Sequence, residues 1–356
     1  MITELMQEKE NAFLQAVKEI AEPQSDLFVY GAGQAGQNVA EFLRARQIPF
    51  AGFVVNERYL PSGEAKSLEE LLRTTTRTVH LIVAFSGYCA ETLASYRHAK
   101  VYDFDCWGGM DRRSSLWADL DMDWVRQHER ELTDVYEQLA DERSREVMIA
   151  FLNQKVSMKY GYMRKTKSEE QYFDPELIEL GNREVFVDCG AYDGDTAAAF
   201  LDALHAQGKE DYKAIYSYEP DAANYAKLVA RDIPKNICRQ EGVSDEEAVL
   251  SFSSETTSSQ IAKDGDLTIH VNTLDNELLG EPVTFIKMDI EGVELRALKG
   301  AENIIKQRRP KLAICVYHKR EDLYEIMNYL RHIVPTYRFY LRNYEESSRE
   351  VVLYAL

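Results

Sequence analysis

The sequence predicts an α/β protein with two parallel-sheet domains and a helical connector between them. Its 356 residues exceed the usual size of one domain, which is about 100–200 residues. Short apolar strand patterns alternate with helix patterns in two stretches, and they vanish between residues 111 and 180. Hydrophobic residues make up 45% and charged residues 29%, as is typical of globular chains with real cores.

Charge and cysteine usage exclude several classes of partner. The chain has 42 Lys and Arg residues against 60 Asp and Glu residues, and a net charge of −18 would repel a nucleic-acid backbone. The cysteines form no Cys-x-x-Cys pair and fit a reducing cytoplasm; they are Cys89, Cys106, Cys189, Cys238 and Cys315. There is no basic leader, and the longest apolar run, 79–85, is too short to span a bilayer. We therefore expect a cytoplasmic protein that binds a small molecule and neither nucleic acid nor a membrane. The sequence leaves open whether the chain forms a homo-oligomer.

The first domain is predicted from a helix, a glycine turn and three strands. Residues 1–24 show the periodicity of one amphipathic helix. Residues 25–110 then read as a small Rossmann-like nucleotide-binding domain, with strands at 27–30, 50–55 and 79–85 and a helix at 67–72 that Ser67 caps. The turn after the first strand carries Gly31, Gly33 and Gly36 in the spacing of a dinucleotide fingerprint, followed by a helix.

The ligand of this glycine turn is left open by the sequence. Asn56 stands where the ribose-binding acid of a dinucleotide site is expected, and this disfavours NAD. A sugar nucleotide or other nucleotide, a domain kept only for docking, and a working NAD site are the three alternatives.

The connector, 111–180, has apolar residues at helical spacing and one unusual stretch of charge. No acid occurs between Glu146 and Glu169, whereas Lys159 and Arg164 lie there with further lysines. A solvated helix face is one interpretation, and a contact for a phosphorylated ligand is the other.

A second α/β series occupies residues 181–356. Strand patterns appear at 185–188, 214–219, 249–252, 283–289, 311–316, 337–342 and 351–355. The polar stretch 343–350 allows the last two strands to pair as an antiparallel hairpin.

The first strand of this series ends in the strongest motif of the chain, Asp188-Cys-Gly190-Ala191-Tyr-Asp-Gly194-Asp195-Thr196. Glycines allow a ligand to approach the backbone, and the following helix offers unpaired N–H groups. The spacing differs from the dinucleotide fingerprint, and acids stand where an anion would otherwise bind. Such a turn suits a ligand with positive charge, for example S-adenosylmethionine.

Three more strand ends should face the same cleft, because ligands of open α/β sheets bind beyond the carboxyl ends of the strands. The second strand ends in Glu219-Pro220-Asp221, and Glu219 is placed to accept hydrogen bonds from ribose hydroxyls. A later strand ends in Asp289-Ile-Glu291, and the next ends near His318.

These strings, together with 272–275 and with Tyr172, strongly resemble the FkbM-type family of S-adenosylmethionine-dependent methyltransferases over about residues 170–356. The resemblance implies a class I methyltransferase fold, which is a Rossmann-like seven-stranded sheet with a terminal antiparallel hairpin. It implies methyl transfer to a hydroxyl, commonly of a sugar or secondary metabolite. The cofactor-binding residues it implies are Asp188, Gly190, Ala191, Gly194, Asp195, Thr196, Glu219, Pro220, Asp221, Ser244 and Asp245.

For catalysis we predict His318 as the base, followed by Asp289, because a hydroxyl must lose its proton during the transfer and free imidazole titrates near neutrality. Acceptor contacts are predicted at Tyr172, Glu291, Lys159 and Arg164. Asp289, Glu291 and His318 also form a set that could ligate a divalent metal, which is not predicted. The alternative functions are an NAD-dependent oxidoreductase and a non-catalytic nucleotide-binding module.

Overall fold

The computed structural model describes residues 1–356 except 21–24, 60–64, 86–92, 94–96, 106–120 and 253–266. Cys89 and Cys106 lie outside the described residues. The chain divides into two compact units: unit 1 comprises Met1–Glu129, Met148–Lys165 and Glu345–Arg349, and unit 2 comprises Arg130–Val147, Thr166–Tyr344 and Glu350–Leu356. The connector expected at 111–180 is thus shared between the two units, and the hairpin segment 345–349 belongs to unit 1.

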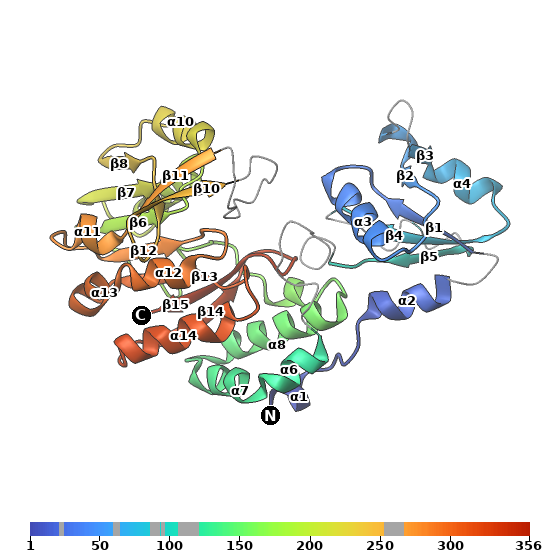
Figure 1. Ribbon diagram of the computed structural model, residues 1–356, viewed down its shortest axis with the longest axis horizontal. Coiled ribbons are helices and arrows are strands. Elements are labelled where there is room, and N and C mark those ends of the chain that lie inside the picture. The colour runs from blue at the N-terminus through green and yellow to red at the C-terminus, as the bar shows by residue number, and fades with distance from the viewer. Residues whose placement is uncertain (21–24, 60–64, 86–92, 94–96, 106–120, 253–266) are drawn as a thin grey trace. The chain divides into compact units, whose positions relative to one another are not determined.

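Unit 1 contains a parallel sheet in which the described strands have the order β3-β2-β1-β4-β5 (Figure 1). The strands are β1 (Ser25–Tyr30), β2 (Phe53–Val55), β3 (Ala65–Ser67), β4 (Thr78–Val83) and β5 (Ala99–Tyr102). Helices α3 (Gln34–Ala45) and α4 (Leu68–Thr74) and the 3-10 turn η1 (Glu57–Tyr59) connect them. Ser67 caps α4 by accepting a hydrogen bond from the Glu70 amide at 3.2 Å, which confirms that prediction.

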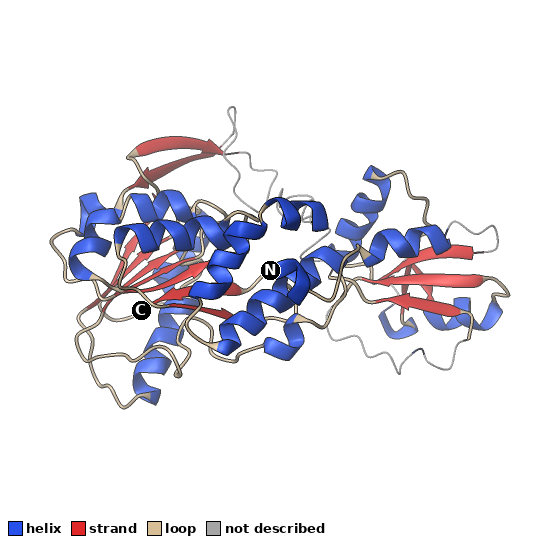
Figure 2. Ribbon diagram, turned by 90° about the horizontal axis from the view of Figure 1, so that it is seen from below, coloured by secondary structure: helices blue, strands red, loops and turns tan. Residues whose placement is uncertain are grey.

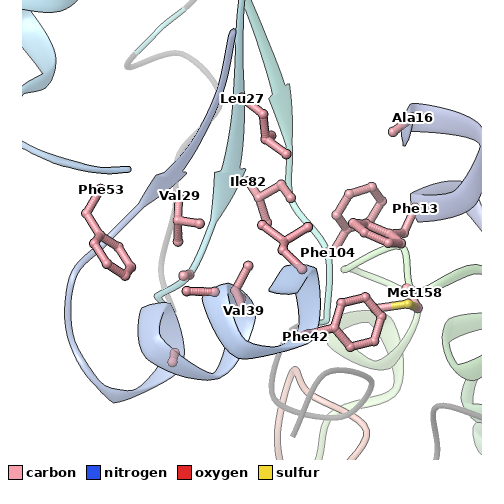
Figure 3. Close-up of a cluster of buried hydrophobic side chains, with 14 residues drawn as sticks. Phe13, Ala16, Leu27, Val29, Val39, Phe42, Phe53, Ile82, Phe104 and Met158 are labelled. Atoms are coloured by element: carbon pink, nitrogen blue, oxygen red, sulfur yellow. The ribbon is translucent and has the colours of Figure 1, made fainter. Parts of the chain in front are cut away.

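The main core of unit 1 joins the sheet to segments far away in the sequence (Figure 3). Val29 of β1, Val39 of α3 and Ile82 of β4 are fully buried there. Phe13 lies edge-on to the rings of Phe42 and Phe104, with ring centroids 5.2 Å and 5.7 Å apart. Burial of apolar area contributes roughly 25 cal/mol per Å². The contacts of Phe13 therefore hold its helix, α2 (Ala12–Ile20), against the sheet.

The prediction of a single helix over residues 1–24 is wrong. The structure has two helices, α1 (Ile2–Leu5) and α2 (Ala12–Ile20). Between them, the amides of Gln7 and Glu8 both donate to the Asn153 side chain at 2.8 Å, and Lys9 donates to the Met6 carbonyl at 2.7 Å. Because these side chains satisfy backbone groups that a helix would use, the helix stops there.

The remaining helices before the second sheet are α6 (Met122–Gln127), α7 (Glu129–Gln138) and α8 (Glu142–Ser157), followed by the 3-10 turn η3 (Met163–Thr166). They agree with the mostly helical character predicted for this region. No helix among the described residues is long and apolar enough to cross a membrane.

Unit 2 is built on a sheet whose described strands have the order β14-β15-β13-β12-β6-β7-β8. The strands are β6 (Val185–Cys189), β7 (Ala214–Tyr218), β8 (Asn236–Arg239), β12 (Phe285–Met288), β13 (Lys311–Cys315), β14 (Phe339–Asn343) and β15 (Val351–Ala355). The connecting helices are α9 (Asp195–Ala206), α10 (Ala222–Ala230), α11 (Leu274–Leu278), α12 (Glu294–Lys299), α13 (Glu302–Arg308) and α14 (Asp322–Ile333). Helices lie on both sides of the red strands in Figure 2.

The predicted terminal hairpin is confirmed. β15 pairs antiparallel with both β13 and β14, while β13, β12, β6, β7 and β8 run parallel. The predicted seven-stranded sheet is therefore present in unit 2, and its parallel strands end at one common edge.

The assignment of residues 249–252 to this sheet is wrong. They form β10 (Ala248–Phe252), which pairs with β11 (Leu267–Asn272) in a separate small sheet that also contains β9 (Gly242–Val243). The seventh strand of the sheet is instead β8, which lies at its edge and was not predicted from the sequence. Its sequence, Asn-Ile-Cys-Arg, lacks an apolar run because an edge strand is half exposed.

Candidate active site

The four loops predicted to form one cleft follow four adjacent strands, in the order β13-β12-β6-β7. Since these strands are parallel, the loops after Cys189, Tyr218, Met288 and Cys315 all leave the same edge of the sheet.

The turn after β6 requires glycine at its centre. Gly190 has φ +82°, and a Cβ atom there would lie 1.9 Å from the Asp289 carbonyl oxygen. The amides of Gly190 and Ala191 both donate to the Tyr218 carbonyl at 3.0 Å. The ends of β6, β7 and β12 are therefore locked together by backbone contacts, and any side chain at position 190 would separate them.

Asp188 does not face open space. Its carboxylate is fully buried, 3.0 Å from the buried ammonium of Lys287, which also donates to the Gly190 carbonyl at 2.7 Å. Burial opposes the charge on Lys287, but the carboxylates of Asp188 and Asp289 outweigh it and raise the pKa of Lys287. Lys287 was not predicted as a site residue, although a lysine within an apolar strand is a signal for a buried ion pair.

The rest of the motif begins helix α9. Gly194 caps the helix with φ +87°, and a Cβ there would come within 3.0 Å of Leu228 and Arg231. Asp195 accepts a hydrogen bond from the Thr196 amide at 2.7 Å in the first turn. The turn is thus closely packed on its protein side.

Glu219 is buried at the end of β7 and is held by two backbone amides. Its carboxylate accepts hydrogen bonds from Tyr192 and from Asp221, each at 2.9 Å. Burial raises the pKa of Glu219, and the two amide donors counter that shift. Asp221, which follows Pro220, caps helix α10 through the Asn224 amide at 2.8 Å. Glu219 therefore links the β6 turn to the β7 turn.

Ser244 and Asp245, which the resemblance implies as cofactor-binding residues, follow β9. The Ser244 amide donates to the Asn272 carbonyl at 2.9 Å, and its own carbonyl would lie 1.9 Å from a Cβ at Gly300. Asp245 pairs with Arg296 at 2.7 Å, and this arginine lowers its pKa. No contact joins these two residues to Glu219 among the interactions found for the described part of the chain.

Asp289 accepts hydrogen bonds from two tyrosines that the topology brings to it. The hydroxyls of Tyr172 and Tyr317 each lie 3.0 Å from one of its carboxylate oxygens. Burial opposes its ionisation, but the charges of His318 and Lys287 and the hydroxyl donors lower the pKa of Asp289 overall. Tyr172 therefore meets Asp289, as expected from a shared site, and Tyr317 is an addition.

His318 is 2% exposed and lies among carboxylates. Its Nε2 atom is 3.4 Å from Asp289 and 3.8 Å from Glu291, and its Nδ1 atom is 2.9 Å from Glu294. Burial opposes its charge, but Glu294, Asp289 and Glu291 raise the pKa of His318 to about 10. The argument for His318 from the pKa of free imidazole does not apply here, because the ring holds its proton at neutral pH.

Glu294, like Lys287 and Tyr317, is a site residue that was not predicted from the sequence. It is fully buried at the first position of α12, where it also accepts the amides of Ile290 at 2.9 Å and Gly292 at 3.3 Å. The signal was present as the third acid of the string Asp289-Ile-Glu291-Gly292-Val-Glu294.

The residues that could hold a metal in the structure differ from the set that the sequence offered, Asp289, Glu291 and His318. Among the described residues, the donor atoms of Asp289, Glu294 and His318 lie within 4.8 Å of one another, whereas Glu291 is not part of this group. Glu294 and His318 already contact each other directly at 2.9 Å. We assign no metal to the site.

Lys159 and Arg164, predicted as acceptor contacts, lie in unit 1. Lys159 pairs with Glu8 at 2.8 Å, and Arg164 pairs with Glu346 at 2.7 Å. Both basic side chains are thus engaged by carboxylates that are distant in sequence, and a phosphate would have to compete with them.

The glycine turn of unit 1 lies between β1 and helix α3. Gly31 has φ +117°, and a Cβ at Gly36 would lie 2.1 Å from the Gly31 carbonyl, so α3 packs closely on β1. A Cβ at Gly33 would meet nothing within 4 Å. Asn56, in the ribose position, is held by the Tyr30 hydroxyl at 2.7 Å and by Glu69 at 3.0 Å. Its side chain is therefore engaged within the protein.

The chain is similar to known proteins in sequence and in fold. Residues 188–339 match the family model of the methyltransferase FkbM domain. The fold resembles the crystal structure of methyltransferase FkbM from Methylobacillus flagellatus KT, with a TM-score of 0.79, 22% identity, and coverage of 98% of this chain and 94% of that chain.

Other likenesses are more distant. An rRNA methylase from Streptococcus thermophilus has a TM-score of 0.33 and 15% identity, with coverage of 49% of this chain and 87% of that chain. A Streptococcus mutans protein solved with SAH has a TM-score of 0.31 and 12% identity, with coverage of 50% and 91%. The search of curated proteins gave no match.

The fold of unit 2 and the matched domain define an S-adenosylmethionine-dependent methyltransferase. More narrowly, residues 188–339 form a methyltransferase FkbM domain.

Proposed function

We propose that the protein transfers a methyl group from S-adenosylmethionine to a hydroxyl of a small acceptor, a sugar, a sugar nucleotide or a related metabolite. The observation that carries this proposal is the meeting of Asp289 and His318, 3.4 Å apart, at the strand edge next to the Asp188 turn. We also propose a cytoplasmic location, which the free thiols of Cys189, Cys238 and Cys315 support.

The residues at this edge fit the cofactor by their chemistry. Asp195, Glu219 and Asp289 present carboxylates, whereas the charge of Lys287 is matched by Asp188. Such a set favours the amino and sulfonium groups of S-adenosylmethionine over the pyrophosphate of a dinucleotide. In this proposal the Gly190–Thr196 turn holds the methionine portion, Glu219 holds the ribose, and Asp221, Ser244 and Asp245 lie towards the adenine.

The cofactor supplies a methyl group that its sulfonium has already activated, so the protein's main tasks are alignment and removal of a proton. The acceptor oxygen forms the new bond to the methyl carbon, and the carbon–sulfur electron pair stays on sulfur. The hydroxyl proton moves to Nε2 of His318 in its neutral form. Asp289, fixed by Tyr172 and Tyr317, accepts a hydrogen bond at the same point.

Acceptor recognition is proposed from the same edge. Glu291 is exposed beside His318, and carboxylate oxygens accept hydrogen bonds from the hydroxyls of sugars. The glycine turn of unit 1 is proposed, separately, to bind a sugar nucleotide or another nucleotide.

The test is His318→Ala, assayed with methyl-labelled S-adenosylmethionine against a panel of sugars and sugar nucleotides. We expect turnover to fall by about 10²–10⁴, with cofactor affinity nearly unchanged. His332→Ala on the exposed side of α14 is the matched control and should keep full turnover.

Lower thermal stability with full turnover in the folded fraction would make His318 structural and overturn its catalytic role. If a chelator abolishes activity and a divalent ion restores it, His318 is a metal ligand and its proposed role as the base is wrong.

A further inference from the structure

A buried glutamate stands behind the histidine of the proposed site. Glu294 is fully buried, and its Oε1 atom lies 2.9 Å from His318 Nδ1. The other ring nitrogen, Nε2, points to the carboxylates of Asp289 and Glu291 at 3.4 Å and 3.8 Å. The imidazole therefore has a buried anchor on one side and the predicted reaction point on the other.

We propose that Glu294 is a positioning residue for methyl transfer, holding the His318 ring so that Nε2 faces Asp289 and the acceptor hydroxyl. The inference rests on the proposed function. A carboxylate on one ring nitrogen fixes the tautomer and orientation of histidine and leaves the other nitrogen for chemistry. The same logic orders the carboxylate and histidine of hydrolytic triads.

Glu294 also shapes the loop that carries Asp289. Its Oε1 accepts hydrogen bonds from the amides of Ile290 and Gly292. Both Glu291, with φ +57°, and Gly292, with φ +91°, have left-handed backbone conformations. A Cβ at Gly292 would lie 3.5 Å from the His318 Cβ, so this loop packs directly on the histidine. One carboxylate thus sets both the β12 loop and the histidine after β13.

Other charged groups around His318 come from three segments. Asp289 and Glu291 belong to the β12 loop, Glu294 to α12, and Asp322 to the first turn of α14, where it accepts the Lys319 amide at 2.9 Å. The Tyr317 ring lies 4.1 Å from the imidazole. Burial and Glu294 raise the pKa of Asp322 to about 7, so this acid also titrates within the working range.

Removing the charge of Glu294 should change how His318 titrates. In the wild type the raised pKa of His318, about 10, means that the rate rises with pH as the imidazolium loses its proton. Glu294→Gln keeps the shape but removes the nearest anion, so the pKa should fall towards the ordinary 6.5 and the rising limb of kcat/KM should move to lower pH. The maximum kcat should fall about 10- to 100-fold because the ring is held less firmly.

The experiment combines pH–rate profiles with NMR titration of ¹⁵N-histidine-labelled protein, in which His318→Ala identifies the His318 signal. Glu302→Gln is the matched control, because Glu302 opens the neighbouring helix α13 and pairs with Lys306 and Tyr329. It should leave the profile and the His318 signal unchanged. Glu294→Asp should recover part of the lost kcat and keep the limb near the wild-type position.

The outcomes separate the two proposals. A Glu294→Gln protein that folds and shows an unchanged His318 pKa and an unchanged pH limb would overturn the positioning role. If the NMR pKa shifts but His318→Ala keeps full turnover, the proposed catalytic function fails and the ion pair is structural. If Glu294→Gln fails to fold, Glu294→Asp takes its place. A wild-type kcat in that variant would contradict the proposal, because the shortened side chain moves the carboxylate that holds the ring.

Discussion

Single residues at the strand ends of unit 2 hold the backbone and face the site at the same time. Glu219 accepts two amides and still has lone pairs for a ligand, and Glu294 accepts two amides while it contacts His318. Gly190 serves by lacking a side chain, because the Asp289 carbonyl occupies the space of a Cβ. Substitutions here will therefore affect both folding and binding, and their tests need a folding control.

Glu219→Ala should weaken S-adenosylmethionine binding by about 1.5–3 kcal/mol, because the ribose hydroxyls lose a charge-assisted partner. That loss corresponds to roughly 10- to 150-fold in Kd, measured by calorimetry. Asp211→Asn, an exposed acid before the amino end of β7 that pairs with Lys235, is the control and should bind normally. An unchanged Kd in a folded Glu219→Ala protein would contradict the assignment.

The sequence located these residues only in part. Glu219, Asp289 and His318 were predicted because each follows an apolar strand pattern, and parallel strands end at one edge. The burial of Asp188 against Lys287 was not predicted, because the two residues lie on different strands, β6 and β12, and meet only where these strands pair. Glu294 was missed because its partner, His318, follows a different strand, and such a contact has no local signature.

At the scale of elements, the strands with buried faces were predictable and the exposed ones were not. β15 was predicted at 351–355 from its continuous apolar run, and all of its residues are buried. β8 and β10 were confused because both are short and partly exposed, so hydrophobic pattern alone does not say which one joins the sheet. Pairing with β7 decides which of the two strands joins the sheet, and that pairing is a tertiary interaction.

One element contact predicts a pH effect on stability. Asp141 caps α8 through the Ser144 amide at 2.8 Å and pairs with buried Arg342 of β14 at 2.7 Å. Burial opposes the ionisation of Asp141, but Arg342 and Ser144 outweigh it and lower the pKa from 3.8 to about 2. Because the folded-state pKa is the lower one, the stabilisation is present above about pH 4 and is lost as pH falls towards 2.

Asp141→Asn keeps a capping side chain but removes the charge. Near neutral pH we expect the variant to be less stable than the wild type by about 1 kcal/mol, since the carboxylate is about a third exposed. The difference in the free energy of urea unfolding should shrink between pH 4 and pH 2. Glu142→Gln changes an exposed neighbour and is the control; its free energy of unfolding should show no such trend with pH. If the difference for Asp141→Asn stays constant with pH, the charge of Asp141 does not contribute to stability.

For the whole molecule, the two sheets carry two glycine turns of different chemistry. The turn of unit 1 has the spacing of a nucleotide site, and its ribose position holds Asn56, which Tyr30 and Glu69 engage. The turn of unit 2 is surrounded by carboxylates and belongs to the matched methyltransferase domain. We assign the methyl donor to the turn of unit 2.

A crystal structure of the protein with S-adenosylhomocysteine, at a concentration that saturates binding in solution, tests this assignment most directly. We expect the ligand at the carboxyl ends of β6, β7 and β12, with its ribose hydroxyls on Glu219 and its sulfur towards Asp289 and His318. Ligand bound instead at the Gly31–Gly36 turn of unit 1, or at unit 2 with its sulfur away from His318, would contradict the account.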